Sequence, residues 1–176
     1  MKRLTLITLA TLLVLACAHT NTGPMAMATL APTTGQTAKG TVHFTDLKDG
    51  GTEVVVDLTN VPPGVHGFHI HEGASCGNDA KDAGGHFNPL NMPHAAPDAT
   101  SHHAGDFGNV TADDKGEVHA TFVTHSITVA AGTTSVIGHA VVLHANPDDL
   151  TTQPTGNAGG RIACGVATSM AGSMQH

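Results

Sequence analysis

Short runs of β-type residues, separated by turn signals, fill most of this 176-residue chain. Seven such runs stand out, at residues 40–46, 52–58, 65–71, 109–113, 117–123, 134–143 and 161–166. Turn signals between them are KDGG at 48–51, PPG at 62–64, ADDKG at 112–116 and AAG at 130–132. No stretch combines helical periodicity with capping residues. The sequence therefore predicts an all-β fold, either an antiparallel barrel or a sandwich.

The N-terminus has the pattern of an export signal. A basic pair at 2–3 precedes an apolar run at 4–16, which is too short to span a bilayer. We interpret residues 1–16 as a signal peptide. Cys17, in the sequence VLAC, stands where a bacterial lipoprotein carries its lipid-accepting cysteine. The alternative is soluble export with cleavage after Ala18, and both alternatives predict an exported protein.

The remaining chain divides into three parts by composition. Residues 17–38 are rich in Thr, Ala, Gly and Pro and are predicted to be a flexible tether. One domain is predicted at 39–168, followed by a flexible tail at 169–176. Within the domain, the long segments 72–107 and 145–160 interrupt the strand pattern. Loops of that length are usually functional.

Two cysteines lie within the predicted domain, and export determines how we interpret them. In an oxidising compartment Cys76 and Cys164 are expected to pair, although two unpaired buried thiols are the alternative. A bridge across so long a loop would contribute about 4–5 kcal/mol in the loop-entropy model.

The charge balance excludes one class of function. Without residues 1–16 the basic side chains number five, against fourteen acids: Lys39, Lys48, Lys81, Lys115 and Arg161. A basic nucleic-acid-binding surface is therefore excluded. An anionic substrate would need a local positive group, and Arg161 is the obvious candidate.

Histidine is the most unusual component of the composition, with 14 residues. His69 and His71 form an H-x-H pair on a predicted strand, so both side chains point to the same face and can hold one ion. Together with further residues in the long loops they make seven candidate ligands: His69, His71, His86, His94, His103, Asp106 and His144. Six imidazoles and one carboxylate exceed what one tetrahedral ion can bind. The set therefore indicates two first-row transition metals close together.

Five motifs carry a resemblance to a known family. They are GFHIHE at 67–72, GGHFNP at 84–89, HHAGDFGN at 102–109, LHANPDDL at 143–150 and GNAGGRIACGV at 156–166. In order and spacing they resemble the copper/zinc superoxide dismutases, in particular the exported bacterial branch. The resemblance covers about residues 39–166. It implies an eight-stranded antiparallel Greek-key β-barrel with two long functional loops.

The resemblance also implies two metal sites. Copper would be held by His69, His71, His86 and His144. Zinc would be held by His86, His94, His103 and Asp106. His86 would belong to both sites as a bridging imidazolate, and one copper and one zinc would be bound per subunit.

Some assignments leave a neighbouring alternative. In HHAGD the family pattern favours His103 over His102 as the zinc ligand. Asp148, rather than Asp149, resembles the carboxylate that links a copper histidine to a zinc histidine. His66 resembles a structural histidine that hydrogen-bonds the backbone near the copper strand.

The implied activity is disproportionation of superoxide to O₂ and hydrogen peroxide in the cell envelope or periplasm. Arg161 would dock the superoxide anion, and His86 would take up a proton. The alternative role for Arg161 is to brace a loop through a backbone carbonyl, and both roles can hold together. The alternative is an exported copper-binding or metal-delivery protein with the same fold and no turnover. A membrane would be contacted only through a lipid at Cys17, and both a monomer and a homodimer remain open.

Overall fold

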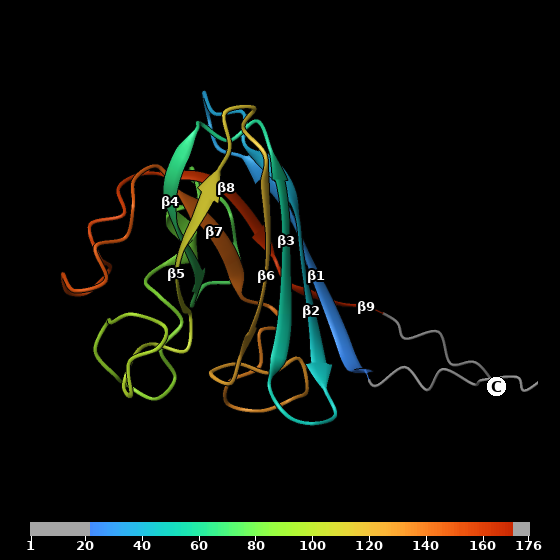
Figure 1. Ribbon diagram of the computed structural model, residues 1–176. Helices are drawn as coiled ribbons and strands as arrows, with labels where there is room; N and C mark the ends of the chain where they lie inside the picture. The colour runs from blue at the N-terminus through green and yellow to red at the C-terminus, as the bar shows by residue number, and fades with distance from the viewer. Residues whose placement is uncertain (1–21, 171–176) are drawn as a thin grey trace, which may run out of the picture.

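The computed structural model describes residues 22–170, which form one antiparallel β-barrel with long loops (Figure 1). Its elements, in chain order, are β1 (Thr22–Pro32), β2 (Lys39–Leu47), β3 (Thr52–Thr59), β4 (Gly64–His71), the 3₁₀ turn η1 (Lys81–Ala83), β5 (Asp106–Ala112), β6 (Val118–Thr124), β7 (Ala140–His144), β8 (Arg161–Val166) and β9 (Thr168–Met170). Within the described residues, no helix is long and apolar enough to cross a membrane.

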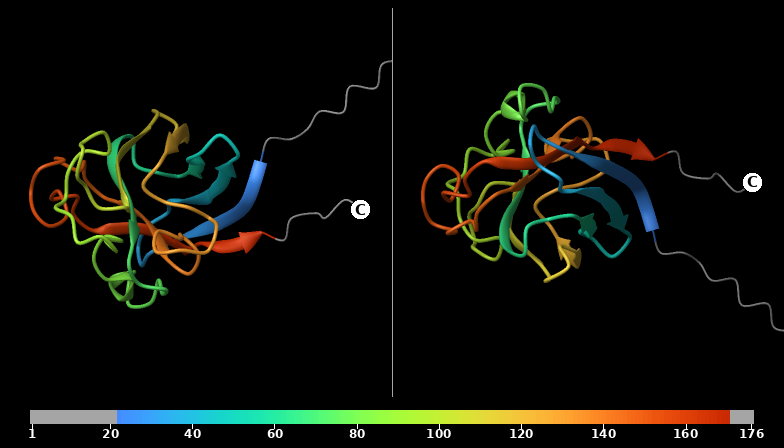
Figure 2. Two further views of the ribbon diagram at one scale, coloured as in Figure 1. Left: turned by 90° about the horizontal axis from the view of Figure 1, so that it is seen from below. Right: turned by 90° about the horizontal axis from the view of Figure 1, so that it is seen from above.

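The strands follow the order β5-β4-β7-β8-β1-β2-β3-β6, and short β9 adds to β1 outside this path. Eight antiparallel strands thus curl into a nearly closed barrel (Figure 2). The strands β4, β7 and β8 are neighbours in the sheet although long loops separate them in the chain. This order confirms the predicted eight-stranded Greek-key fold.

Alternation of side chains explains how the barrel encloses its core. In β3 the residues Val54, Val56 and Leu58 are buried, whereas Glu53 and Asp57 face outward. The five largest fully buried side chains are apolar and come from several strands: Phe44, Phe68, Leu30, Leu58 and Ile70. Because every second side chain of a strand is apolar and faces inward, the sheet encloses one apolar core.

The predicted tether at 17–38 and tail at 169–176 are partly wrong. Residues 22–32 form β1, an integral barrel strand that pairs with β2 and β8, and residues 168–170 form β9. The strand escaped detection because its inward residues include Ala26 and Ala28, which are too small to mark an apolar period in the sequence. The predicted signal peptide 1–16 and Cys17 lie outside the described residues.

The strand expected at 134–143 is also shorter than predicted. Only Ala140–His144 pairs as a strand, and the residues before it form a loop. In this loop Thr128 and Val136 are joined by a backbone hydrogen bond of 2.9 Å, and Val136 is fully buried. Val136 thus reaches the core from a loop and not from a strand, while Ile137 beside it is exposed.

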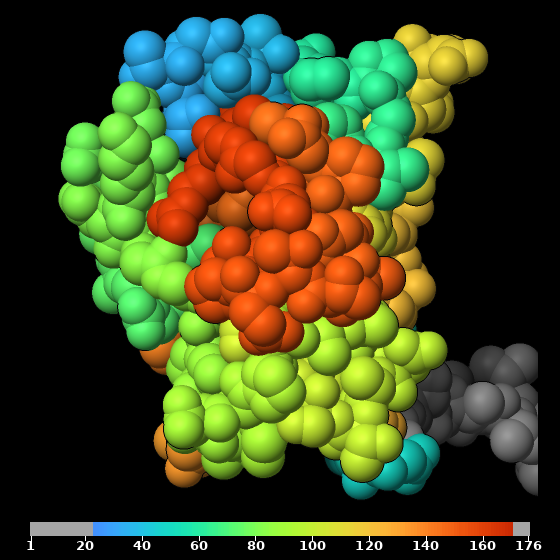
Figure 3. All heavy atoms as spheres, turned by 90° about the vertical axis from the view of Figure 1, so that its left-hand side faces the viewer, coloured from blue at the N-terminus to red at the C-terminus, as the bar shows by residue number. Residues whose placement is uncertain are grey.

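The two long loops lie side by side on one face of the barrel. Figure 3 shows the segment that follows β7 packed against the segment between β4 and β5. A disulfide between Cys76 and Cys164 fastens the first loop to β8, with a sequence separation of 88 residues. This confirms the predicted pairing of the two cysteines.

A pair of substitutions tests the role of β1. Ala28 is fully buried and Thr29 is exposed, so Ala28→Asp should place an unpaired carboxylate in the core while Thr29→Asp should not. We expect Ala28→Asp to lower the free energy of unfolding by about 3 kcal/mol or more, and Thr29→Asp by less than about 0.5 kcal/mol. Urea unfolding measures both. Equal, small effects would mean that the segment is a tether after all.

Candidate metal centre

The strand β4 supplies the first pair of candidate ligands. His69 and His71 alternate with Phe68 and Ile70, so the histidines point away from the core while the apolar residues point into it. Nevertheless both histidines have no exposed surface, because the long loops cover this end of β4. A strand with one face in the core and one face under loops can place imidazoles in a rigid, dry environment.

The seven candidate ligands gather in two adjoining groups, all buried. One group is His69, His71, His86 and His144, and the other is His86, His94, His103 and Asp106. In each group, one ligand atom per residue lies within 4.8 Å of all the others. His86 is the member that both groups share.

In the second group, three imidazole nitrogens surround one carboxylate oxygen. Asp106 Oδ1 lies 2.8 Å from His86 Nδ1, 3.0 Å from His94 Nδ1 and 3.2 Å from His103 Nδ1. A tetrahedral ion with bonds of about 2.0–2.1 Å would place its ligand atoms about 3.3 Å apart. This spacing fits a small four-coordinate cation.

In the first group, backbone carbonyls determine which nitrogens are free. His71 Nδ1 donates to the Gly84 oxygen over 3.0 Å, and His144 Nδ1 donates to the Gly159 oxygen over 3.3 Å. The remaining nitrogens, His71 Nε2 and His144 Nε2, then face each other at 3.1 Å. Neither carries a proton when the rings are neutral, so two lone pairs point into the same space, which a cation would satisfy.

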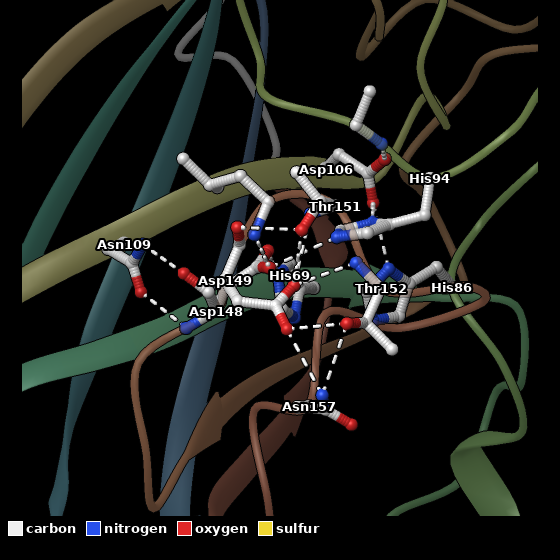
Figure 4. Close-up of polar contacts among 12 residues, drawn as sticks. His69, His86, His94, Asp106, Asn109, Asp148, Asp149, Thr151, Thr152 and Asn157 are labelled. Carbon is white, nitrogen blue, oxygen red and sulfur yellow. Dashed lines mark hydrogen bonds and ion pairs between the residues drawn. The ribbon is translucent and has the colours of Figure 1, made fainter.

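Asp148 connects the two groups from outside. Its Oδ2 accepts from His69 Nε2 over 2.8 Å and its Oδ1 from His94 Nε2 over 3.0 Å (Figure 4). These bonds fix the ring orientation and the protonated nitrogen of one histidine in each group. They leave His69 Nδ1 and His94 Nδ1 directed inward.

Four buried nitrogens in the centre have no hydrogen-bond partner: His69 Nδ1, His86 Nε2, His94 Nδ1 and His103 Nδ1. His69 belongs to the first group, His94 and His103 belong to the second, and His86 belongs to both. An unsatisfied buried polar atom costs about 1–3 kcal/mol, so four in one place need a physical explanation. Metal coordination to both groups provides it, and the donor set therefore fits two ions.

The electrostatics keep the ligands in the form that binds a metal. Burial lowers the pKa of His69 to about 4, against the opposing effect of its hydrogen bond to Asp148. Burial, together with the nearby His69, lowers the pKa of His144 to about 3. Burial alone would raise the pKa of Asp106, but the His86 hydrogen bond and neighbouring histidines lower it below its ordinary value. At neutral pH the imidazoles of His69 and His144 are therefore neutral and the Asp106 carboxylate is ionised.

The structure resolves both neighbouring alternatives from the sequence. His103 is buried beside Asp106, whereas the ring of His102 bonds the His103 carbonyl oxygen over 2.7 Å. Asp148 lies between the two ligand groups, whereas Asp149 is exposed and accepts from the hydroxyl of Thr152 over 2.6 Å. The preferred residue of each pair is thus the one in the centre.

Two positioning residues were missed in the sequence. Asn109 binds the backbone of Asp148 reciprocally: Asp148 N donates to Asn109 Oδ1 over 2.7 Å, and Asn109 Nδ2 donates to the Asp148 oxygen over 2.9 Å. Gln153 does the same for His94, with distances of 2.9 Å and 2.6 Å. Asn109 ends the motif HHAGDFGN and could have been noticed there, but nothing in the sequence marks Gln153.

Arg161 braces the loop next to the first group. Its guanidinium donates to the carbonyl oxygens of Ala80 and Gly84, and Gly84 also accepts from the ligand His71. The side chain remains partly exposed, and burial lowers its pKa. The bracing role is therefore present.

His66 supports the centre through the backbone. Its Nδ1 lies 2.9 Å from the His144 carbonyl oxygen and its Nε2 lies 2.7 Å from the Pro62 oxygen. The predicted hydrogen bonding of His66 to the backbone is confirmed.

The fold and this centre define an all-β protein with a buried pair of adjoining histidine-rich metal-ligand groups. Residues 38–167 match the family model of the copper/zinc superoxide dismutases (SODC), and the chain belongs to that family. It is also similar to a structure titled "Crystal Structure Analysis of the clock protein EA4", with 37% sequence identity and a TM-score of 0.75. That similarity covers 83% of this chain and 94% of the other.

A glycine substitution tests how the centre is assembled. Gly156 has a φ of +65°, and a Cβ atom there would overlap the Asp148 carboxylate and lie 2.7 Å from His94 Nε2. Gly156→Ala should displace Asp148 and weaken zinc binding by about 10–100-fold, as loss of outer hydrogen bonds to metal ligands does. Competition with a chromophoric chelator measures the affinity.

The matched control is Gly160→Ala, because a Cβ atom at Gly160 would meet nothing within 4 Å. Equal zinc affinities in the two variants would show that Asp148 does not control the ligands.

Proposed function

We propose that the protein disproportionates superoxide, converting two superoxide anions and two protons to O₂ and hydrogen peroxide. The observation that carries this proposal is the pair of ligand groups joined at His86, with four buried nitrogens that have no hydrogen-bond partner among the described residues. Membership of the family supports the same conclusion.

The donor sets support a specific assignment of the two metals. His69, His71, His86 and His144 supply only nitrogen, which suits copper, whereas three histidines and Asp106 supply the mixed set that zinc accepts. Bound copper would supply the one-electron chemistry, oxidising one superoxide and reducing the next. The zinc ligands would hold the shared imidazole in orientation.

His86 is proposed to bridge the two ions as an imidazolate. Its Nδ1 faces the second group, 2.8 Å from Asp106 Oδ1, and its Nε2 is buried without a hydrogen-bond partner. The ring therefore offers one nitrogen to each group. Whenever Nε2 is not engaged by a metal, it can hold a proton and deliver it to the reduced product.

Arg161 is proposed to attract the substrate. The chain has a formal net charge of −7, which repels an anion overall. Arg161 is the only arginine within the described residues and lies at the start of β8, paired in register with the ligand His144. Its guanidinium is held by two carbonyl oxygens, so the positive charge is fixed and partly exposed beside the ligands.

Substitution of Arg161 tests this role. Arg161→Gln removes the charge but keeps a donor for one carbonyl, and Arg161→Lys keeps the charge without the planar fork. We expect superoxide to decay fastest with the wild type, more slowly with the Lys variant and most slowly with the Gln variant, in which the rate falls about tenfold or more. The rate should depend less on salt concentration in the Gln variant, because it lacks the positive charge. Stopped-flow spectroscopy measures both.

Metal content must be matched between these variants, so that the rates report on the arginine. If superoxide decays at the same rate and with the same salt dependence in the presence of the Gln and Lys variants, the charge of Arg161 does not attract the substrate.

A copper-binding protein without turnover is the second candidate. The similarity to a structure whose title names a clock protein favours considering this candidate, because that title names no superoxide chemistry. Superoxide decay in the presence of the metal-loaded protein decides between the two. A rate no faster than that of buffer with a chelator would leave only metal binding.

We further propose export to the cell envelope or periplasm, with a lipid anchor at Cys17 after removal of residues 1–16. Soluble export after cleavage at Ala18 remains the alternative. Neither segment lies within the described residues, and the proposal rests on the basic and apolar pattern at the N-terminus.

Cys17→Ser tests the anchor. In a bacterial host the wild-type protein should partition with membranes and carry the added mass of acyl chains, and the variant should lose both. Membrane fractionation with mass spectrometry measures this. A variant that stays membrane-bound at the mass of the wild type would exclude lipidation at Cys17.

A further inference from the structure

Three methionines gather on the outer surface of the strands β9, β1 and β2, away from the metal centre. Met25 pairs in register with Met170 of β9, and Met27 is two residues further along β1. Residues paired across antiparallel strands, and residues two apart on one strand, share a face of the sheet. We call Met25, Met27, Met170 and the adjoining His43 the outer methionine cluster.

The packing of β1 is the reverse of what a core strand would favour. Ala26 and Ala28 point inward with no exposed surface, whereas Met25 and Met27 point outward and are partly exposed. Burying a methionine side chain is worth about 1.5–3 kcal/mol. The outward placement of Met25 and Met27 gives up part of this stabilisation, so packing of the barrel core does not explain it. The large sulfur-containing side chains are on the face where they contribute least to the core.

His43 extends the row of donors onto the next strand. It pairs in register with Met27 and is partly exposed. Among the residues that the structure describes, its ring has no hydrogen bond or ion pair. An imidazole with free nitrogens therefore lies on the same face as three thioethers.

The sheet spacing allows these donors to converge. Directly paired residues have Cβ atoms about 4.5–5.5 Å apart, and diagonal neighbours on adjacent strands are about 7–8 Å apart. Methionine has three rotatable side-chain bonds, so thioethers at such spacing can turn toward one point. Met27 lies at the centre, with His43 directly opposite on β2 and Met25 two residues before it.

We propose that the outer methionine cluster is a binding site for monovalent copper. Thioether sulfur and imidazole nitrogen are the soft and intermediate donors that Cu(I) prefers, whereas zinc, calcium and magnesium favour other sets. Only binding is proposed, with no change in the oxidation state of the metal. The cluster lies on the part of the barrel where β9 and the start of β1 run, remote from the long loops that cover the buried centre (Figures 1 and 2).

This site does not depend on the proposed enzymatic function. It could hold copper on a protein with or without turnover, and its donors are separate from the seven residues of the buried groups. An apolar surface that contacts a second copy of the chain is the other use for such a cluster, and the experiment distinguishes the two.

The test uses the full chain, loaded with copper and zinc at the buried centre and carrying Cys17→Ser, so that no free thiol competes. Methionine methyl groups are labelled with ¹³C, and Cu(I) is added under ascorbate without oxygen. We expect the methyl signals of Met25, Met27 and Met170 to shift with one added equivalent, while Met92, a 40% exposed methionine of the β4–β5 loop, stays in place.

Variants then measure the affinity by competition with a coloured Cu(I) chelator. Combined replacement of Met25, Met27 and Met170 by leucine keeps the apolar volume and should lower the affinity of the added equivalent at least tenfold. Met92→Leu is the matched control and should change nothing. His43→Gln should weaken binding by a smaller factor.

Several results would overturn the proposal. These are unshifted cluster methyl groups, a triple variant that binds the added equivalent as tightly as the wild type, and shifts confined to Met174 or Met92. Cluster signals that move with protein concentration and not with Cu(I) would indicate self-association in place of metal binding.

Discussion

The crowding of buried imidazole nitrogens with no proton between them is the constraint on which this structure depends. His71 Nε2 and His144 Nε2 meet at 3.1 Å, and four further nitrogens have no hydrogen-bond partner. Each such atom costs free energy in a protein interior unless something positive satisfies it. Bound cations would therefore stabilise this arrangement, and the long loops help to hold it in place.

Barrel and loops contribute differently to that receptacle. The strands β4 and β7 supply His69, His71 and His144 from a rigid sheet, which suits a site that must keep its geometry. The first long loop supplies His86, His94 and His103, and Asp106 begins β5. The loops are fixed by the Cys76–Cys164 disulfide and by Asp148, which binds a histidine of each group. Coil is thus held in place by covalent and polar contacts, where an apolar core could not reach it.

The sequence predicted the chemistry of the site better than the edges of the fold. Closely spaced histidines in recognisable motifs carry information in a few residues, and all seven candidate ligands lie together in the structure. The strand β1 was missed because alanine at its inward positions leaves no apolar period. The segment 134–139 was assigned to a strand because a buried apolar residue such as Val136 gives the same sequence signal in a loop as in a strand. Gln153 could not be found at all, since its contact with His94 exists only through the fold of the second loop.

The central claim is that one histidine serves two metals at once. X-ray diffraction from crystals loaded with copper and zinc, collected at the absorption edge of each metal, tests it directly. We predict one copper peak among His69, His71, His86 and His144, one zinc peak among His86, His94, His103 and Asp106, and the His86 ring between the two peaks. A single ion in the centre, or two ions of which only one is bound by His86, would contradict the account.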